Sequence, residues 1–227
     1  MLEKLKMLDA ALGWADRGFE VFPLKPRSKV PLGTIVTRGF LDASKDLGVI
    51  HDWWRTEPRA NIGVRTGGGR FVVDLDDAGA VSWFVNACGR HGGAPRTLTT
   101  RTSRGFHVFF SADAGVPCST GRLAPGADVR GDGGYVVAAP SIHPSGVVYR
   151  IERDLPVARA PEWLVDEVVV HERPVPARVQ FNSDACKHDS KLRGVAGILA
   201  LVANAREGER NAMFYWGTCR LAEKVSA

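Results

Sequence analysis

The sequence predicts an α+β fold, with a large mixed domain over residues 1–170, a linker over 171–189 and a small helical segment over 190–227. Three observations predict it. Helical patterns alternate with short β-type segments up to residue 88, strand patterns dominate from about residue 97, and helical patterns return after a proline-rich stretch. With 227 residues and 44% hydrophobic content, the chain is long enough to bury one sizeable core and a smaller appendage.

The first part of the chain is predicted to alternate helices with short strands. Residues 2–17 place apolar side chains near helical spacing, and Gly18 ends that helix. Asp77 is the expected N-cap of a later helix, because its side chain is suited to accept from a free backbone N–H. The other elements expected here are a strand at 19–24, a helix at 46–55, strands at 61–64 and 71–76, and a helix at 78–88.

The second part of the chain is predicted to be rich in strands. They are expected at 97–102, 106–110, 127–130, 135–139 and 147–151, with glycine-containing turns at 103–105 and 131–134. The segment Arg173-Pro174-Val175-Pro176-Ala177 has the composition of a linker. Beyond it, residues 190–204 and 209–227 show helical patterns.

The net charge and the spacing of the cysteines indicate which partners and which cellular compartment to expect. The formal charge of +5 and the sequence pI of about 9.2 are compatible with a polyanionic partner. The four cysteines form no C-x-x-C pair, which argues against a zinc ribbon and favours reduced thiols in a cytoplasmic protein. No apolar run approaches the roughly 20 residues that a membrane span needs, so no membrane partner is expected. A helical pattern runs to the last residues, so we expect the chain to be part of a longer protein.

The run Phe71-Val72-Val73-Asp74-Leu75-Asp76 is the most informative feature of the chain. Side chains alternate along a strand, so Asp74 and Asp76 point to the same face. Two like charges there repel each other, and a divalent cation between them would remove the repulsion. Mg²⁺ and Mn²⁺ prefer carboxylate oxygens and commonly accompany phosphate-bearing substrates. The alternative, a strand end that simply faces water, is the ordinary reading of an isolated pair of this kind.

Two later segments supply matching chemistry. His107 follows the turn Ser103-Arg104-Gly105, where Ser, Arg and His side chains can donate to phosphate oxygens. Asp128 lies in a short strand before a glycine-rich turn, and Arg130 follows it. Three carboxylates could hold two metal ions, one to activate a 3′-hydroxyl and one to neutralise a triphosphate. Asp128 as a turn residue and His107 as a packed histidine are the alternatives.

The ordered set of motifs resembles the primase-polymerase (Prim-Pol) domain of the archaeo-eukaryotic primase superfamily, of the bifunctional DNA primase/polymerase N-terminal type. The resemblance covers roughly residues 5–165. In chain order its motifs are a glycine that ends a helix before a strand and Pro at 18–23, a Lys-x-Pro loop at 29–31, a tryptophan helix at 53–54 and an Asn-Ile-Gly strand at 61–63. They continue with the aspartate pair at 74–76, a serine turn leading to His at 103–107, Asp-Val-Arg-Gly with Gly-Gly-Tyr at 128–135, and Pro-Ser at 140–141. Arg104 departs from the pattern, since the family often has glycine there.

The resemblance implies a nucleotidyltransferase that joins dNTPs or NTPs on a single-stranded DNA template and primer with Mg²⁺ or Mn²⁺. It implies an α/β module beside an RRM-like sheet, with the active site in the cleft between them. Its metal ligands would be Asp74, Asp76 and Asp128, and its nucleotide contacts Lys29, Ser103, Arg104, His107 and Arg130.

The resemblance further implies that the protein is encoded by a phage, a plasmid or another mobile element, and that it works with a helicase domain or protein. No Walker-type G-x-x-x-x-G-K-[ST] motif is present, so such a motor is expected outside these 227 residues. Two other functions remain open from the sequence. They are a non-catalytic nucleic-acid-binding module and another metal-dependent enzyme, such as a nuclease.

Overall fold

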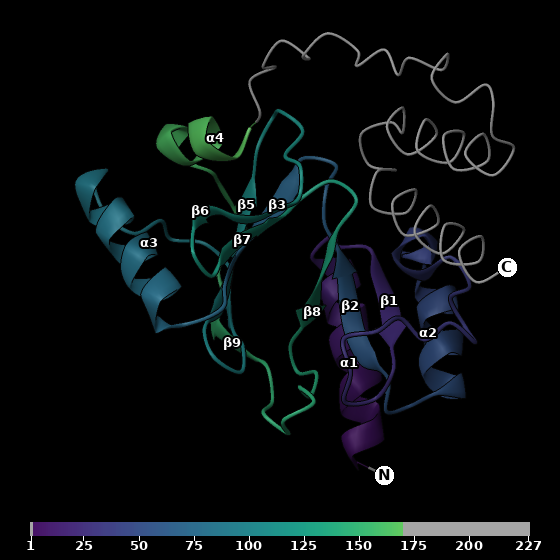
Figure 1. The fold of residues 1–227 in the computed structure, drawn as a ribbon. Helices are drawn as coiled ribbons and strands as arrows, with labels where there is room; N and C mark the ends of the chain where they lie inside the picture. Colours follow the sequence, from purple (N-terminus) through teal and green to yellow (C-terminus); the bar gives the residue numbers. More distant parts are fainter. Residues whose placement is uncertain (1, 170–227) are drawn as a thin grey trace, which may run out of the picture. The chain divides into compact units, whose positions relative to one another are not determined.

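The computed structural model describes residues 2–169, all of which belong to the first of two compact units, Met1–His171 and Glu172–Ala227 (Figure 1). The predicted linker at 171–189 and the predicted helical segment at 190–227 lie outside the described residues. Within 2–169 the protein is α+β, with helices and two sheets whose strands pair almost entirely antiparallel.

The smaller sheet has the strand order β1 (Val21–Leu24), β2 (Asn61–Arg65) and β8 (Tyr135–Ala138). Helices α1 (Leu2–Asp16) and α2 (Leu47–Thr56) pack beside it and against each other (Figure 1). Asp46 caps α2 by accepting a hydrogen bond from the Val49 N–H at 3.0 Å. Gly18, at a φ of 81°, takes the left-handed conformation that lets the chain leave α1 and enter β1.

The larger sheet is built around β3 (Arg70–Leu75), which carries the aspartate pair at its end. Its strand order is β6 (Ser119–Ala124), β7 (Ala127–Arg130), β3, β5 (Phe106–Ser111), β4 (Thr99–Arg101) and β9 (Arg150–Arg153). The short β10 (Ala158–Arg159) pairs with β5 in parallel. β3 therefore lies between β7 and β5, which are the strands that carry the other predicted site residues.

Alternation along β3 divides the core into two layers. Phe71, Val73 and Leu75 pack with α3 (Ala78–Arg90) and α4 (Glu162–Val168) on one face of the larger sheet. Val72 on the other face joins Phe109 and residues of α1 and the smaller sheet in a second cluster. Figure 1 shows α3 on the side of the larger sheet away from the smaller one. The face that carries Val72 also carries Asp74, so the predicted site lies on the side of the smaller sheet.

Most predicted elements are present with small shifts at their ends. Asp77 caps α3 by accepting from the Ala80 N–H at 2.9 Å, as predicted. The strand expected at 147–151 is instead Arg150–Arg153, because Tyr149 turns back and its N–H donates to the Ser141 carbonyl at 2.9 Å. The 3₁₀ turn Gly39–Asp42 and the elements β6, β10 and α4 were not predicted. None of the helices among residues 2–169 combines the length and apolar character needed to cross a bilayer.

Candidate active site

Three neighbouring strands bring the predicted acidic and basic residues to one place. In the register of the sheet, Asp74 on β3 is the direct partner of His107 on β5 and of Asp128 on β7. Direct partners in antiparallel strands place their side chains on the same face, roughly 4.5–5.5 Å apart at Cβ. Arg130, two residues after Asp128, joins the same face. Residues far apart in sequence therefore form one cluster.

His107 holds Asp74 from one side. Its Nε2 lies 3.3 Å from Asp74 Oδ1, and the histidine is only 5% exposed. Burial by itself raises the pKa of Asp74, but contact with His107 and the charges of His107, Arg130 and Lys29 outweigh it. The pKa of Asp74 is thus below its ordinary value, and this buried side chain stays ionised near neutral pH.

Arg130 lies between Asp74 and Asp128. Its Nη2 donates to Asp128 Oδ2 at 2.7 Å, and its Nε lies 3.7 Å from Asp74 Oδ2. The other oxygen of Asp128 accepts from the Gly121 N–H on β6 at 2.9 Å. A buried carboxylate needs such partners, because an unpaired charge is costly away from water. Arg130 therefore supplies a positive charge between two strands that carry negative ones.

Asp76 stands at the open end of the cluster, with a side chain that is 40% exposed. Partial burial and the negative charges of Asp74 and Asp128 raise its pKa above the ordinary value. The nearest cation is Arg104 in the turn before β5, whose Nη2 is 3.9 Å from Asp76 Oδ1. The three carboxylates are thus close enough to repel one another, and Asp76 feels the repulsion most.

Further side chains surround the carboxylates. Lys29, in the loop after β1, is close enough for its charge to lower the pKa of both Asp74 and His143. Tyr149 is buried, and its ring centroid lies 5.9 Å from that of His107. Burial and the charges of Asp74 and Asp76 raise the pKa of Tyr149 to about 12, which keeps its hydroxyl protonated at neutral pH. The acidic centre is thus flanked by a protonated tyrosine and by the cationic side chains of Lys29, Arg104 and Arg130.

Comparison with protein families gives one match, to the bifunctional DNA primase/polymerase N-terminal family, Prim-Pol, over residues 11–163. The match covers well over half of the chain. The chain belongs to this family. A search of curated proteins finds none that matches. Membership in the Prim-Pol family indicates a nucleotidyltransferase-type enzyme, and the α+β fold with antiparallel sheets is consistent with a Prim-Pol catalytic core.

The Prim-Pol site has oxygen donors of the kind that a divalent cation needs, and the guanidinium of Arg130 lies between two of the carboxylates. Within residues 2–169, no three His, Cys, Asp or Glu side chains stand in the spacing of a metal site. The oxygens of Asp128 instead accept hydrogen bonds from Arg130 and the Gly121 N–H. The three acids lie on or beside two adjacent strands, and their carboxylate oxygens are of the kind that Mg²⁺ and Mn²⁺ prefer.

The Prim-Pol structure brings most of the sequence-predicted residues together. The residues placed at the centre or its edge are Lys29, Asp74, Asp76, Arg104, His107, Asp128 and Arg130. Ser103 lies in the turn before β5, and no contact with the acids is found for it among the described residues. The neighbouring hydroxyl of Thr102 stabilises this turn, because its Oγ1 accepts a hydrogen bond from the Gly105 N–H at 3.0 Å.

Two residues of the Prim-Pol site were not predicted to belong to it. Tyr149 was placed in an ordinary strand, and no local pattern distinguishes it, because its approach to His107 depends on a chain reversal after Ser141. His143 was expected to serve loop structure near the cleft and was given no role in the chemistry; it does serve the loop, since its Nδ1 accepts from the Ser145 N–H at 3.1 Å. Its ring is 6.2 Å from that of Tyr149, so it belongs to the edge of the site as well.

Proposed function

We propose that the chain is a DNA-dependent primase/polymerase that joins nucleotides on a single-stranded DNA template by two-metal nucleotidyl transfer. The observation that carries the proposal is the register of β7, β3 and β5. It puts Asp128, Asp74 and His107 on one face, directly opposite one another, with Asp76 at the open end. Membership in the Prim-Pol family supports the same reaction class.

In this proposal Asp74, Asp76 and Asp128 hold Mg²⁺ or Mn²⁺. When bound, the ions supply charge that activates the primer 3′-hydroxyl and neutralises the triphosphate. His107 fixes the carboxylate of Asp74 through its Nε2, so that one acid is pre-oriented before substrate arrives. Pre-orientation lowers the cost of organising the site during reaction.

The cations around the acids have a different task. In this proposal Lys29 and Arg104 contact the phosphates of the incoming dNTP or NTP, since each lies beside the carboxylates that would hold the ions, whereas His107, only 5% exposed and with its Nε2 beside Asp74, acts by holding that acid. Arg130 neutralises Asp74 and Asp128 in the described structure. If divalent ions were bound to these acids, the guanidinium of Arg130 could contact a phosphate, for which its forked geometry is well suited.

The test is synthesis on a defined template. The full chain is incubated with single-stranded DNA, labelled dNTPs or NTPs, and Mg²⁺ or Mn²⁺, with and without primer. Elongated strands and pyrophosphate are expected from the wild type and none from Asp74→Ala or Asp76→Ala. Asp113→Ala is the matched control, since it removes an exposed carboxylate that pairs with exposed Arg159.

Product identity separates this proposal from its rivals. Shortened strands or free nucleotide would point to a nuclease or nucleotide hydrolase, and template binding without incorporation to a binding module. Synthesis at the wild-type rate by Asp74→Ala and Asp76→Ala would refute the assignment of the site.

A further inference from the structure

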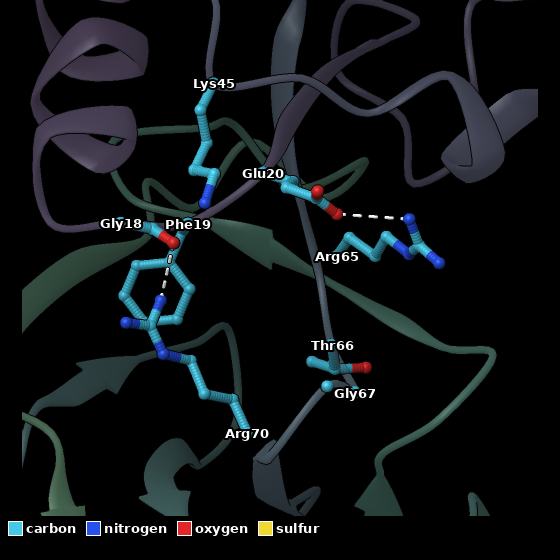
Figure 2. Close-up of a pocket in the computed structure, with 9 residues that line it drawn as sticks. Gly18, Phe19, Glu20, Lys45, Arg65, Thr66, Gly67 and Arg70 are labelled. Carbon is cyan, nitrogen blue, oxygen red and sulfur yellow. Dashed lines mark hydrogen bonds and ion pairs between the residues drawn. The ribbon is translucent and has the colours of Figure 1, made fainter.

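A polar hollow lies at the opposite end of β3 from the aspartates (Figure 2). It has a volume of about 430 Å³, and its charged lining residues are Glu20, Lys45, Arg65 and Arg70. We call it the basic pocket. Arg70 and Asp74 are four residues apart on the same face of β3, which is about 13 Å along a strand. Val72 between them is 1% exposed, so packed core separates the two sites.

The guanidinium of Arg70 is held in place without using an acid. Its Nη1 donates to the Gly18 carbonyl at 2.7 Å, and its Cζ lies 4.6 Å from the centre of the Phe19 ring (Figure 2). Both contacts leave the positive charge uncompensated by any carboxylate among residues 2–169. A cation fixed over an aromatic ring loses little conformational freedom when it binds an anion.

The other charges leave the pocket positive. Arg65 pairs with Glu20 at 3.1 Å, so these two charges offset each other. Lys45 is exposed and has no ion pair within the described residues. Figure 2 shows its amino end reaching into the pocket from the side opposite Arg70. Two uncompensated cations therefore approach the same space from two sides, which is an arrangement suited to a phosphate.

We propose that the basic pocket binds a backbone phosphate of a single-stranded nucleic acid, and so holds the strand at a second point away from the carboxylates. The choice of a nucleic acid as the source of the phosphate rests on the proposed function. The polar lining, the exposed Lys45 and the net charge of +5 favour an extended polyanion over an enclosed small ligand. Each phosphate that the pocket neutralises adds to the salt dependence of binding.

The experiment measures binding of a fluorescent oligo(dT) of about 20 nucleotides by anisotropy, in EDTA and over a range of salt. One phosphate contact to a single strand contributes roughly 0.7 to the slope of log K against log salt, or about fivefold in affinity near 0.1 M salt. We expect Lys45→Ala and Arg70→Met each to lose about that much affinity and slope. Arg90→Ala is the charge-matched control, since Arg90 is exposed in the last turn of α3 on the other side of the larger sheet.

The outcomes are separable from those of the proposed function, because this assay contains no nucleotide or divalent ion. Equal slopes for wild type, Lys45→Ala and Arg90→Ala would overturn the inference even if synthesis is robust. Calorimetric binding of inorganic phosphate that Lys45→Ala abolishes, with the DNA slope unchanged, would overturn the nucleic-acid source. In primer extension, Lys45→Ala is expected to raise the KM for template about fivefold and to leave kcat unchanged.

Discussion

Replacing Arg130 by Met tests whether its positive charge stabilises the fold by neutralising Asp74 and Asp128, as a bound cation would. Arg130 contacts Asp128 at 2.7 Å and Asp74 at 3.7 Å, and the side chains of these acids are only 8% and 15% exposed. Met keeps most of the aliphatic length of Arg and removes the charge and the donors. The variant therefore leaves two largely buried carboxylates next to each other with no cation between them.

The magnitude follows from the burial of the pair. Removing one partner of a buried ion pair destabilises by about 3–5 kcal/mol. The Arg130 side chain is 34% exposed, so solvent screens part of its interaction, and we expect a loss of about 2–3 kcal/mol near neutral pH. Contact with His107 and the charge of Lys29 still lower the pKa of Asp74, which also limits the loss.

The loss should depend on pH in a defined direction. The folded pKa of Asp74 is depressed, in part by Arg130, so its ionised form stabilises the protein above the ordinary carboxyl pKa. That contribution disappears as the pH falls through the depressed folded pKa. The difference in free energy of unfolding between wild type and Arg130→Met should therefore hold from about pH 7 down to the ordinary carboxyl pKa of about 4 and shrink below it.

Urea denaturation of the full chain, followed by tryptophan fluorescence, measures these differences in EDTA and in Mn²⁺. If the three acids accept divalent ions, Mn²⁺ at about 100 times its Kd should return about 2.7 kcal/mol to the variant. Mn²⁺ should stabilise the wild type less, because Arg130 competes for the same oxygens. Arg159→Met is the control, since its pair with Asp113 is 74% and 79% exposed and should be worth about 0.5 kcal/mol or less.

Two results would refute this reasoning. A loss in Arg130→Met no larger than in Arg159→Met would show that the charge between the acids is unimportant for the fold. A full loss that Mn²⁺ leaves unchanged would show that the acids, freed of Arg130, do not take up the ion.

Three further changes have expected outcomes. Asp76→Asn should raise the free energy of unfolding by about 0.5 kcal/mol near pH 7 and leave it unchanged near pH 3. The pKa of Asp76 is raised in the folded protein, so its ionised form destabilises the fold and its protonated form does not. Thr100→Val should be neutral or stabilising in thermal unfolding, because among residues 2–169 the buried Oγ1 of Thr100 has no hydrogen-bond partner, as is also true of Nδ1 of its cross-strand partner His107. Gly105→Ala should destabilise by about 2–3 kcal/mol, because a Cβ there would lie 1.8 Å from the Leu75 carbonyl oxygen.

Each of these changes has an outcome that contradicts it. A gain in Asp76→Asn that persists at low pH would show that charge is not its cause. A loss of more than about 1 kcal/mol in Thr100→Val would mean that a water joins the two buried atoms. For Gly105→Ala the matched variant is Gly89→Ala in α3, where a new Cβ meets nothing within 4 Å and a gain of about 0.5–1 kcal/mol is expected. Equal stability of the two variants would contradict the predicted clash.

Local patterns predicted the parts of the site that depend on one strand or one cap. Asp74 and Asp76 share a face because side chains alternate, and Asp77 caps α3 because Asp suits a helix start. The pairing of Asp74 with both His107 and Asp128 depends on strand order and register, which are long-range properties. Motif order, through the family resemblance, indicated that these residues meet, whereas periodicity alone did not.

The elements that the sequence failed to predict have weak or unusual patterns. β6 is polar and largely exposed, with no apolar alternation, and it forms because β7 offers it a partner edge. α4 is short and follows Pro161, and its apolar residues Trp163, Leu164, Val165 and Val168 are too few to establish a helical period over seven residues. Neither element can be assigned without knowing what it packs against.

The position of the site follows from one face of β3. Along that face exposure rises from 1% at Val72 to 15% for the Asp74 side chain and 40% for the Asp76 side chain. The apolar part of the face joins the larger sheet to the residues of α1 and the smaller sheet, and the acids begin where that packing ends. Side chains from other segments therefore neutralise these acids, and in the described structure Arg130 does so most directly. A fold that places carboxylates at the edge of its own core must keep cations beside them, and this requirement accounts for the charge balance of the site.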